Sequence, residues 1–295
     1  TGYTEWVQTK FHTNMLVNVP YIETFNAGDG GDYVTPAGWI TGTDIDEISV
    51  PFAYVGALYR YREKYSSDTT GFLAFASTHE SFQPIMQGQY AYAASPEINA
   101  NLSQCEVVFD GSACTGVADG TNDYAAEITV GVMENPLEWS TFEPIKTVKV
   151  ESSVQFKHFT ISLADYTGTA KHIALASAAS ADNAFYVDNF QVYTPAVRTP
   201  ENVLVSNITT TGFDVQATLH GADSWNVKVA NHFVNNGNSL KDTDCWATVE
   251  NSKPNIVHVN LPQGVAGSVV TIYVQAQKGG AKSAWALPVT LRVLT

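Results

Sequence analysis

A single carboxylate in the middle of an apolar strand is the first residue of this sequence that could do chemistry. Asp188 lies within Phe185–Tyr193, a run of bulky and β-branched residues that predicts a β-strand. A charge that is buried in a sheet needs a hydrogen-bonding partner or a metal ion. Two interpretations stay open: Asp188 accepts backbone N–H groups at a sheet edge, or it binds a metal.

Three tyrosines with two interleaved arginines form a second candidate site. Tyr59, Tyr61 and Tyr65 lie close together around Arg60 and Arg62. Exposed aromatic rings can stack on sugars, whereas rings that cover a sheet face pack beside the stems of arginines. The three tyrosines are therefore candidate ligand-binding residues, with packing on a sheet as the alternative.

Catalytic motifs are missing from the sequence. It contains neither G-x-S-x-G nor H-E-x-x-H, and its seven histidines are scattered. His79–Glu80 is the only adjacent pair of a histidine and an acid, and an ordinary polar pair explains it. Glycosidases need two carboxylates across a cleft, and the 29 acidic residues cannot be sorted into such a pair from the sequence. We therefore predict no catalytic residue and no enzymatic activity.

The three cysteines allow two arrangements. Cys105 and Cys114 flank Asp110 and Gly111, and a hairpin there would bring the two thiols together. A straight strand would hold them about 30 Å apart, too far for a disulfide. With Cys245 the count is odd, and their spacing does not fit a zinc site. Three unpaired and mostly buried cysteines are the favoured interpretation.

Composition and charge narrow the class of protein. The chain has 295 residues, enough for about two domains, and no apolar run long enough to span a membrane. Its net charge of −14 lies before residue 199, because the six acids after that point are matched by six bases. An acidic surface repels phosphate groups, so nucleic acid is not expected as a partner. High aromatic and low charged content are typical of all-β proteins outside the cytoplasm.

Alternating apolar residues recur with turn signals about every ten residues, which predicts a sandwich or jelly roll. The composition changes at Arg198–Pro200, so we predict one domain over residues 16–197 and another over 198–295. In the second, a Leu261–Pro262 turn followed by Tyr273 predicts a tyrosine corner. Residues 1–15 and the last strand both carry a Trp, which predicts a tandem array whose preceding domain ends in residues 1–15. Chance likeness between two short strands is the alternative.

Ordered sequence pieces resemble two known families. The second domain looks like a fibronectin type III module in Asn260–Pro262, Tyr273–Ala276 and Gly280–Trp285. The first resembles jelly-roll domains of Bacteroidota surface proteins, of the cleaved-adhesin, MAM-like or choice-of-anchor type. The pieces that carry this second resemblance are Pro20–Asn26, Pro36–Trp39, Ala94–Ile98, Val130–Pro136, Ser140–Phe142 and Phe185–Asn189.

The resemblance implies an all-β chain, with a jelly-roll sandwich followed by an immunoglobulin-like sandwich of the fibronectin type III kind. Such jelly rolls often hold a structural calcium ion that ties the opening strand to the closing strand. The family's carboxylates fall on Glu23 and Asp188, and its third acidic position is Asn26 here. An amide oxygen can still bind Ca²⁺, although one negative charge is lost.

The function that the resemblance implies is adhesion outside the cell. We expect a non-catalytic module of a larger repetitive bacterial surface protein, whose jelly roll binds a glycan or a host surface protein. Neighbouring repeats of the same chain would be its other partners. Two alternatives stay open: a purely structural spacer of a surface fibre, or a carbohydrate-binding segment of a secreted hydrolase. A fold resemblance alone does not separate them.

Overall fold

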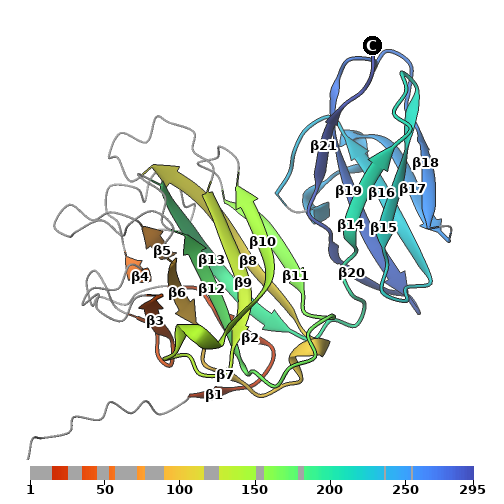
Figure 1. Cartoon of the computed structure of the whole chain (residues 1–295). Coiled ribbons are helices and arrows are strands. Elements are labelled where there is room, and N and C mark those ends of the chain that lie inside the picture. The colour runs from red at the N-terminus through yellow and green to blue at the C-terminus, as the bar shows by residue number, and fades with distance from the viewer. Residues whose placement is uncertain are drawn as a thin grey trace, which may run out of the picture.

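Strand β13 (Asn183–Tyr193) lies between β8 (Glu106–Thr115) on one side and two shorter strands on the other in the computed structural model of the chain (Figure 1). The first half of β13 pairs with β5 (Phe72–Ala76), and the second half pairs with β2 (Tyr21–Glu23). The predicted strand Phe185–Tyr193 is therefore confirmed. The structure describes residues 15–25, 35–44, 53–56, 72–76, 90–115, 126–150, 156–178, 183–235, 237–253 and 255–295.

Two sheets form a first sandwich within the described residues. The sheet of β13 has the strand order β11-β8-β13-β5-β4, with β2 added beside β13, and the facing sheet has the order β10-β9-β12-β6-β3. A small parallel pair joins β1 to β7. The remaining bounds are β1 (Leu16–Val17), β3 (Ile40–Thr43), β4 (Ala53–Gly56), β6 (Tyr90–Ala94), β7 (Glu97–Ile98), β9 (Ala126–Met133), β10 (Phe142–Val150), β11 (Lys157–Ser162) and β12 (His172–Ala178), with 3-10 turns η1 (Leu102–Gln104) and η2 (Trp139–Thr141).

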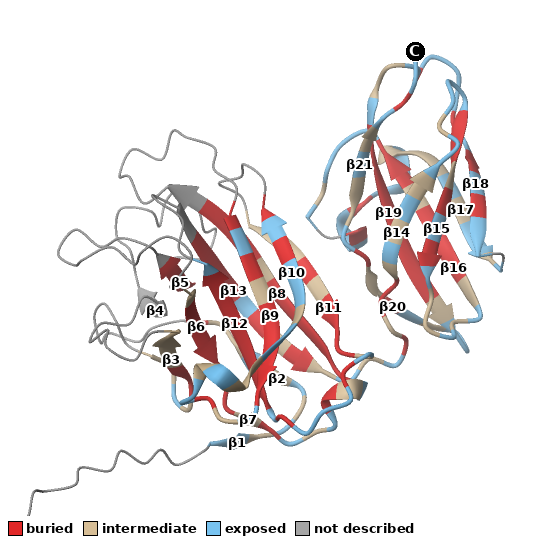
Figure 2. Cartoon of the chain, in the orientation of Figure 1, coloured by how far each residue is buried: buried red, intermediate tan, exposed pale blue. Residues whose placement is uncertain are grey.

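The chain passes back and forth between these two sheets, which gives the jelly-roll connectivity. From β5 to β13 most successive long strands change sheet: β5, β8, β11 and β13 lie in one, and β6, β9, β10 and β12 in the other. The inward-facing side chains of both sheets form one apolar core. In Figure 2 the strands of both sheets are red over most of the stretches that supply these buried residues. The core includes fully buried rings of Phe109, Phe159, Phe185 and Phe190.

A second sandwich follows in the chain. Its sheets have the orders β14-β15-β18 and β17-β16-β19-β20, with β21 also paired to β19. This division of strands is that of a fibronectin type III-like sandwich, so the predicted fold class is confirmed. Its strands are β14 (Glu201–Ser206), β15 (Gly212–Thr218), β16 (Ser224–Ala230), β17 (Cys245–Ser252), β18 (Ile256–Asn260), β19 (Val269–Lys278), β20 (Ala281–Trp285) and β21 (Val289–Arg292), with 3-10 turns η3 (Gly237–Ser239) and η4 (Asp242–Asp244).

Tyr273 does not make the tyrosine corner that the sequence predicts. Its ring is fully buried, and its hydroxyl donates to the carbonyl of Val234 at 3.1 Å and accepts from the N–H of Val234 at 2.7 Å. Val234 lies 39 residues earlier, in the segment after β16, whereas a tyrosine corner bonds a few residues upstream. The tyrosine therefore fastens a distant loop rather than a neighbouring turn.

The segment between the two sandwiches is fastened to the first one by a buried carboxylate. Glu106 is fully buried at the start of β8. Its oxygens accept the Thr199 N–H at 2.7 Å, the Thr199 hydroxyl at 3.0 Å and the Tyr193 hydroxyl at 2.7 Å. Burial and the neighbouring Glu106 raise the pKa of Tyr193. Arg198 adds a bond from Nη2 to the Ser103 carbonyl at 2.5 Å.

The cysteines follow the straight-strand alternative. Strand β8 is continuous from Glu106 to Thr115, so Asp110 and Gly111 lie in mid-strand and no hairpin brings Cys105 and Cys114 together. Cys105 is free and buried, and Cys245 is free and partly exposed. The predicted domain boundaries at residues 15/16 and 197/198 stay predictions, and residues 1–14 lie outside the described part of the chain.

No helix in the part of the chain that the structure describes is long and apolar enough to cross a membrane.

Candidate functional site

Asp188 lies at an interruption of the strand pairing around β13. The β5 ladder ends at Val187 and the β2 ladder begins at Phe190, while on the β8 side the register shifts between Asp188 and Gln191. Asn189 adopts a left-handed φ of 50°, which turns its side chain outward and forms a bulge. Asp188 is only 5 % exposed, and its Oδ1 accepts the Asn189 N–H at 2.7 Å. The carboxylate therefore sits at a bulge of a central strand, not at the sheet edge that one interpretation expected.

Glu23 lies on the neighbouring strand, close to Asp188 in register. Its Cα partner on β13 is Phe190, two residues after Asp188. Glu23 Oε1 accepts the Phe25 N–H at 2.9 Å, and Oε2 accepts a long bond of 3.4 Å from the Tyr21 hydroxyl. Trp39 Nε1 donates to the same hydroxyl at 2.8 Å, and burial raises the pKa of Tyr21. The predicted pair of carboxylates therefore comes from two adjacent strands, one at each end of the first sandwich's sequence.

The described residues include two of the three predicted calcium ligands, Glu23 and Asp188. Ca²⁺ takes six to eight oxygen ligands, and Glu23 and Asp188 each also hold a backbone N–H. No group of three or more His, Cys, Asp or Glu side chains that could hold a metal occurs among the described residues. Asn26, the third predicted ligand, lies outside them. The calcium site therefore stays a prediction, with the donor chemistry of two carboxylates in its favour.

Asp110 and His158 form a polar cluster next to the bulge that the sequence did not predict. Asp110 is the Cα partner of Asp188 across β8 and β13. Its Oδ1 lies 2.9 Å from His158 Nδ1, and its Oδ2 accepts from Asn189 Nδ2 at 2.9 Å. The His158 N–H in turn donates to Asn235 Oδ1 of the second sandwich at 2.6 Å. Among the bonds of the described residues, no serine, threonine or cysteine side chain contacts this pair.

Aromatic rings gather on the outer face of the five-stranded sheet. Trp139 stacks with Phe142 at a centroid distance of 4.8 Å and with Tyr90 at 5.3 Å, and it packs against Tyr92 at 5.6 Å. Tyr90, Trp139 and Phe142 are each partly exposed, and we call these three rings the outer aromatic patch. They belong to a cluster of their own, separate from the core between the sheets.

The outer aromatic patch is held in place by two glycines and by one turn. A Cβ atom on Gly42 would lie 2.6 Å from the Tyr92 ring, and one on Gly131 would lie 2.6 Å from the Phe142 ring, so only glycine admits the rings this close to the sheet. The Tyr92 hydroxyl donates to the Pro136 carbonyl at 3.0 Å and holds the turn that carries Trp139. Next to this turn Leu137 is 53 % exposed. The result is an ordered, half-exposed apolar surface.

The predicted tyrosines cannot be compared with this patch. Tyr59, Tyr61 and Tyr65 lie outside the described residues, and so does His79–Glu80. The sequence analysis did not single out Trp139 or Tyr90 as ligand-binding residues. A signal was present for one of them, because an isolated Trp in a polar turn after Asn135–Pro136 needs an apolar contact.

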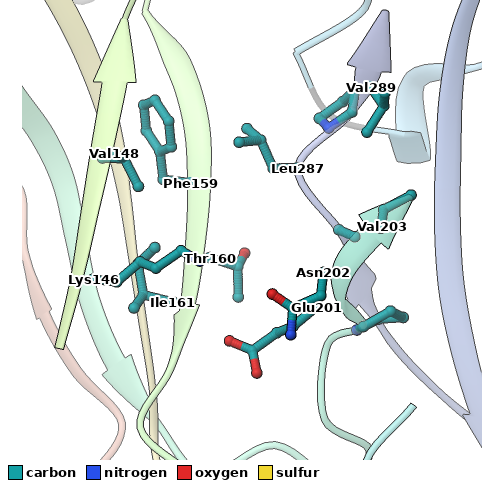
Figure 3. A pocket seen from close by; sticks show the side chains of 13 residues that line it. Lys146, Val148, Phe159, Thr160, Ile161, Glu201, Asn202, Val203, Leu287 and Val289 are labelled. Atoms are coloured by element: carbon teal, nitrogen blue, oxygen red, sulfur yellow. The ribbon is translucent and has the colours of Figure 1, made fainter. Parts of the chain in front are cut away.

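A pocket of about 200 Å³ lies between the two sandwiches (Figure 3). One wall comes from Lys146 and Val148 on β10 and from Thr160 on β11, which are the outermost strands of their sheets on this side. The opposite wall comes from β14 and from the segment between β20 and β21, including Leu287. Figure 3 shows Thr160 facing Glu201 and Asn202 across this gap.

Comparisons with known proteins leave the family open. No protein-family model matches the sequence, and no curated protein matches it significantly. Among solved structures, the K2 cleaved adhesin domain of Lys-gingipain is similar at 12 % identity and a TM-score of 0.44, over 59 % of this chain and 99 % of that one. A two-domain fibronectin type III segment of chicken tenascin is similar at 14 % identity and a TM-score of 0.25, over 72 % and 95 %.

A third structure is a glycoside hydrolase domain, Endo-D, from Streptococcus pneumoniae R6. It is similar at 13 % identity and a TM-score of 0.36, and the matched region covers 94 % of this chain and 44 % of that domain. The chain thus spans less than half of that domain. These similarities are too weak to carry a functional argument, so the strand order described above remains the basis for the fold.

Proposed function

We propose that this chain is a non-catalytic adhesion module of a larger extracellular surface protein, whose jelly roll binds a glycan through the outer aromatic patch. The observation that carries the proposal is the partly exposed stack of Tyr90, Trp139 and Phe142. Rings of this kind offer flat apolar surface, which the apolar faces of sugar rings can cover. The exposed Leu137 beside them enlarges the same surface.

The absence of catalytic motifs supports the non-catalytic part of the proposal. The Asp110–His158 pair lacks a nucleophile among its described contacts, and its histidine is tied to Asn235 through the backbone. Arrangements for acyl transfer require a nucleophile, a base and an orienting group in contact. A host surface protein, in place of a glycan, is the other partner that an exposed apolar patch would suit.

A glycan array with the full chain tests the proposal. We expect selective binding that Trp139→Ala weakens at least tenfold, because the central ring of the stack is lost. Leu204→Ala is the matched control, since Leu204 is 61 % exposed on the second sandwich and lies outside the patch. Circular dichroism would verify that both variants fold. If the chain binds no glycan on the array, or if both variants lose the same binding affinity, glycan binding by this patch is overturned.

A spacer role is the second candidate function, and the fastening of the inter-sandwich segment favours it. Glu106 holds Thr199 through two hydrogen bonds, and Arg198 holds the Ser103 carbonyl. These bonds fasten the segment to the first sandwich, and the bond from the His158 N–H to Asn235 Oδ1 joins the two sandwiches directly, as a spacer of fixed shape needs. No binding to glycans or surface proteins, together with a single rigid shape in small-angle scattering, would favour the spacer over the adhesin.

A further inference from the structure

We propose that the outer aromatic patch selects glycans that carry positively charged amino sugars and rejects acidic glycans. This inference rests on the proposed function, because it names the class of glycan that the same site takes. The observation behind it is that each ring of the patch has an acidic neighbour. Glu138 directly precedes Trp139 in the sequence, and Glu143 directly follows Phe142. No lysine, arginine or histidine is next to any of the three rings in the sequence.

Glu138 is held beside Trp139 by the backbone of a short turn. The Glu138 N–H donates to the Asn135 carbonyl at 3.0 Å. The Glu138 carbonyl accepts from the N–H of Thr141 at 3.0 Å and from the Thr141 hydroxyl at 2.8 Å. The side chain of Glu138 is exposed and makes no capping hydrogen bond. Because the Cα atoms of Glu138 and Trp139 are about 3.8 Å apart, this carboxylate is available to a ligand on the Trp139 ring.

Asp44 supplies a carboxylate at the other end of the ring stack. Its Oδ1 accepts the Tyr90 N–H at 2.9 Å, and its own N–H donates to the Tyr90 carbonyl at 3.1 Å. Tyr90 lies on β6 and Phe142 on β10, with β12 and β9 between these strands, and both rings stack on Trp139. Acidic side chains are therefore present at both ends of the stack.

Two further carboxylates flank the Phe142 end of the patch. Glu143 follows Phe142, and Glu134 follows Met133, which is the Cα partner of Phe142. Both acids are exposed. Burial is the main cause that raises the pKa of Tyr166, and Glu143 and Glu134 raise it further, so both acids lie near the same residue. The negative charges at this end therefore act together.

The lysines and arginines of the described first sandwich do not neutralise these four acids. None of them forms an ion pair with one of the acids among the described residues. They are bonded to backbone carbonyls (Lys171, Arg198), face the second sandwich (Lys146, Lys157) or lie opposite Glu127 in register (Lys149). The potential over the patch is therefore negative, and it attracts cations within about one Debye length, roughly 8 Å.

A protonated amine on a sugar gains an attraction here that a neutral hydroxyl does not. In water, one carboxylate at about 7 Å from a ligand charge strengthens the binding of a cation by about threefold and weakens that of an anion by the same factor. Several carboxylates around one stack multiply this factor. The rings then supply apolar contact for any sugar, and the acids decide which charge the sugar carries.

Titration calorimetry of the full chain with three β-1,4-linked pentamers tests the inference. The pentamer of glucosamine is cationic, that of N-acetylglucosamine is neutral and that of glucuronic acid is acidic at about pH 6, where carboxylates are ionised. We expect the affinity to fall in this order, at least tenfold from first to last at about 0.1 M salt. The order should disappear at about 1 M salt, where the Debye length is about 3 Å.

Two outcomes would overturn the charge selectivity. Equal affinities for the three pentamers, or tighter binding of the acidic one, would overturn it and leave glycan binding by the patch in place. Absence of binding by all three would overturn it as well, and the glycan array then decides whether the patch binds other glycans. A failure of this inference and a failure of the proposed function are therefore distinguishable.

Three variants locate the selectivity. Glu138→Gln removes one charge at nearly constant size, and we expect it to weaken binding of the glucosamine pentamer about threefold without changing that of the neutral pentamer. Glu250→Gln is the matched control, because Glu250 is exposed on β17 of the second sandwich. Trp139→Ala should weaken both pentamers at least tenfold. Unchanged affinity in Glu138→Gln, or equal loss in Glu250→Gln, would contradict the assignment. Full binding of the glucosamine pentamer by Trp139→Ala would also contradict it, since the net charge of −14 would then account for the binding.

Discussion

Two buried carboxylates in the same sheet, Glu106 on β8 and Asp188 on β13, accept backbone N–H groups from very different distances along the chain. Glu106 accepts from Tyr193 and Thr199, which lie 87 and 93 residues further along the chain. Asp188 accepts from the N–H of Asn189, its immediate neighbour. The distant donors connect segments that would otherwise separate, whereas the adjacent donor shapes the strand locally. Burial of a carboxylate thus has two uses here: Glu106 holds the chain between the sandwiches, and Asp188 holds a bulge beside Glu23.

The largest effect expected from this difference is at Glu106. Glu106→Ala would leave two hydroxyls and one N–H without their acceptor in a buried place, and we expect a loss of about 3 kcal/mol in the free energy of unfolding. Urea denaturation of the full chain measures it. Glu106→Gln keeps one acceptor oxygen and should lose about half as much. Equal losses in the two variants would mean that side-chain volume, rather than acceptance of hydrogen bonds, accounts for the effect.

At Asp188 the expected effect depends on calcium. If Glu23 and Asp188 bind Ca²⁺, free calcium at a hundredfold excess over its dissociation constant should stabilise the chain by about 2.7 kcal/mol. Asp188→Asn keeps an acceptor for the Asn189 N–H but loses the charge, so it should fold normally in EDTA and show no calcium increment. Thermal unfolding with calcium and with EDTA provides the measurement. Identical curves for the wild-type chain would reject the metal and leave Asp188 as a structural carboxylate at the bulge.

The smallest effect concerns the tyrosine beside Glu106. Burial and that carboxylate raise the pKa of Tyr193, so the folded state keeps the phenol proton longer than the unfolded chain does. The stability from this group is complete below about pH 10 and is lost as the pH rises through the raised pKa. Tyr193→Phe should make the alkaline loss shallower by up to about 1 kcal/mol per pH unit, given the partial exposure of the ring.

Urea midpoints between pH 9 and 12 check this prediction. Tyr21→Phe is a parallel case, because burial and Glu23 raise the pKa of Tyr21; its alkaline effect should not change when Glu106→Gln is added. The double variant Glu106→Gln with Tyr193→Phe should depend on pH in this range almost as Tyr193→Phe alone does. Full additivity of the two substitutions would contradict the link between the tyrosine and the carboxylate.

Local pattern was enough to predict the strands and the fold class, since alternation along Phe185–Tyr193 and its neighbours is a property of adjacent residues. It was not enough for Gly111. Next to Asp110 this glycine suggested a turn, yet a Cβ there would lie 2.9 Å from the rings of Phe159 and Phe185. The glycine is therefore needed for close packing in a straight strand, and the rings that require it come from distant strands.

The same limit applies to the candidate sites. Glu23 and Asp188 could be paired from the sequence because a family resemblance supplied the pairing, and the strands β2 and β13 are indeed adjacent. The sequence contained no indication of the role of Glu106, because an acidic residue inside a strand is expected to face solvent unless its partner is known. The outer aromatic patch and the pocket between the two sandwiches each combine segments that only the folded chain brings together.

The position of β11 has a consequence for folding yield. As the outermost strand of its sheet it presents unpaired backbone groups, and such edges template the association of one chain with another. One of these groups, the N–H of His158, donates to Asn235 Oδ1 of the second sandwich. The Phe233 ring of the same sandwich packs against the ammonium group of Lys157. The second sandwich thus covers part of this edge. A chain cut after Pro200 would keep Thr199 bound to Glu106 but would expose this edge, and we expect it to aggregate during refolding.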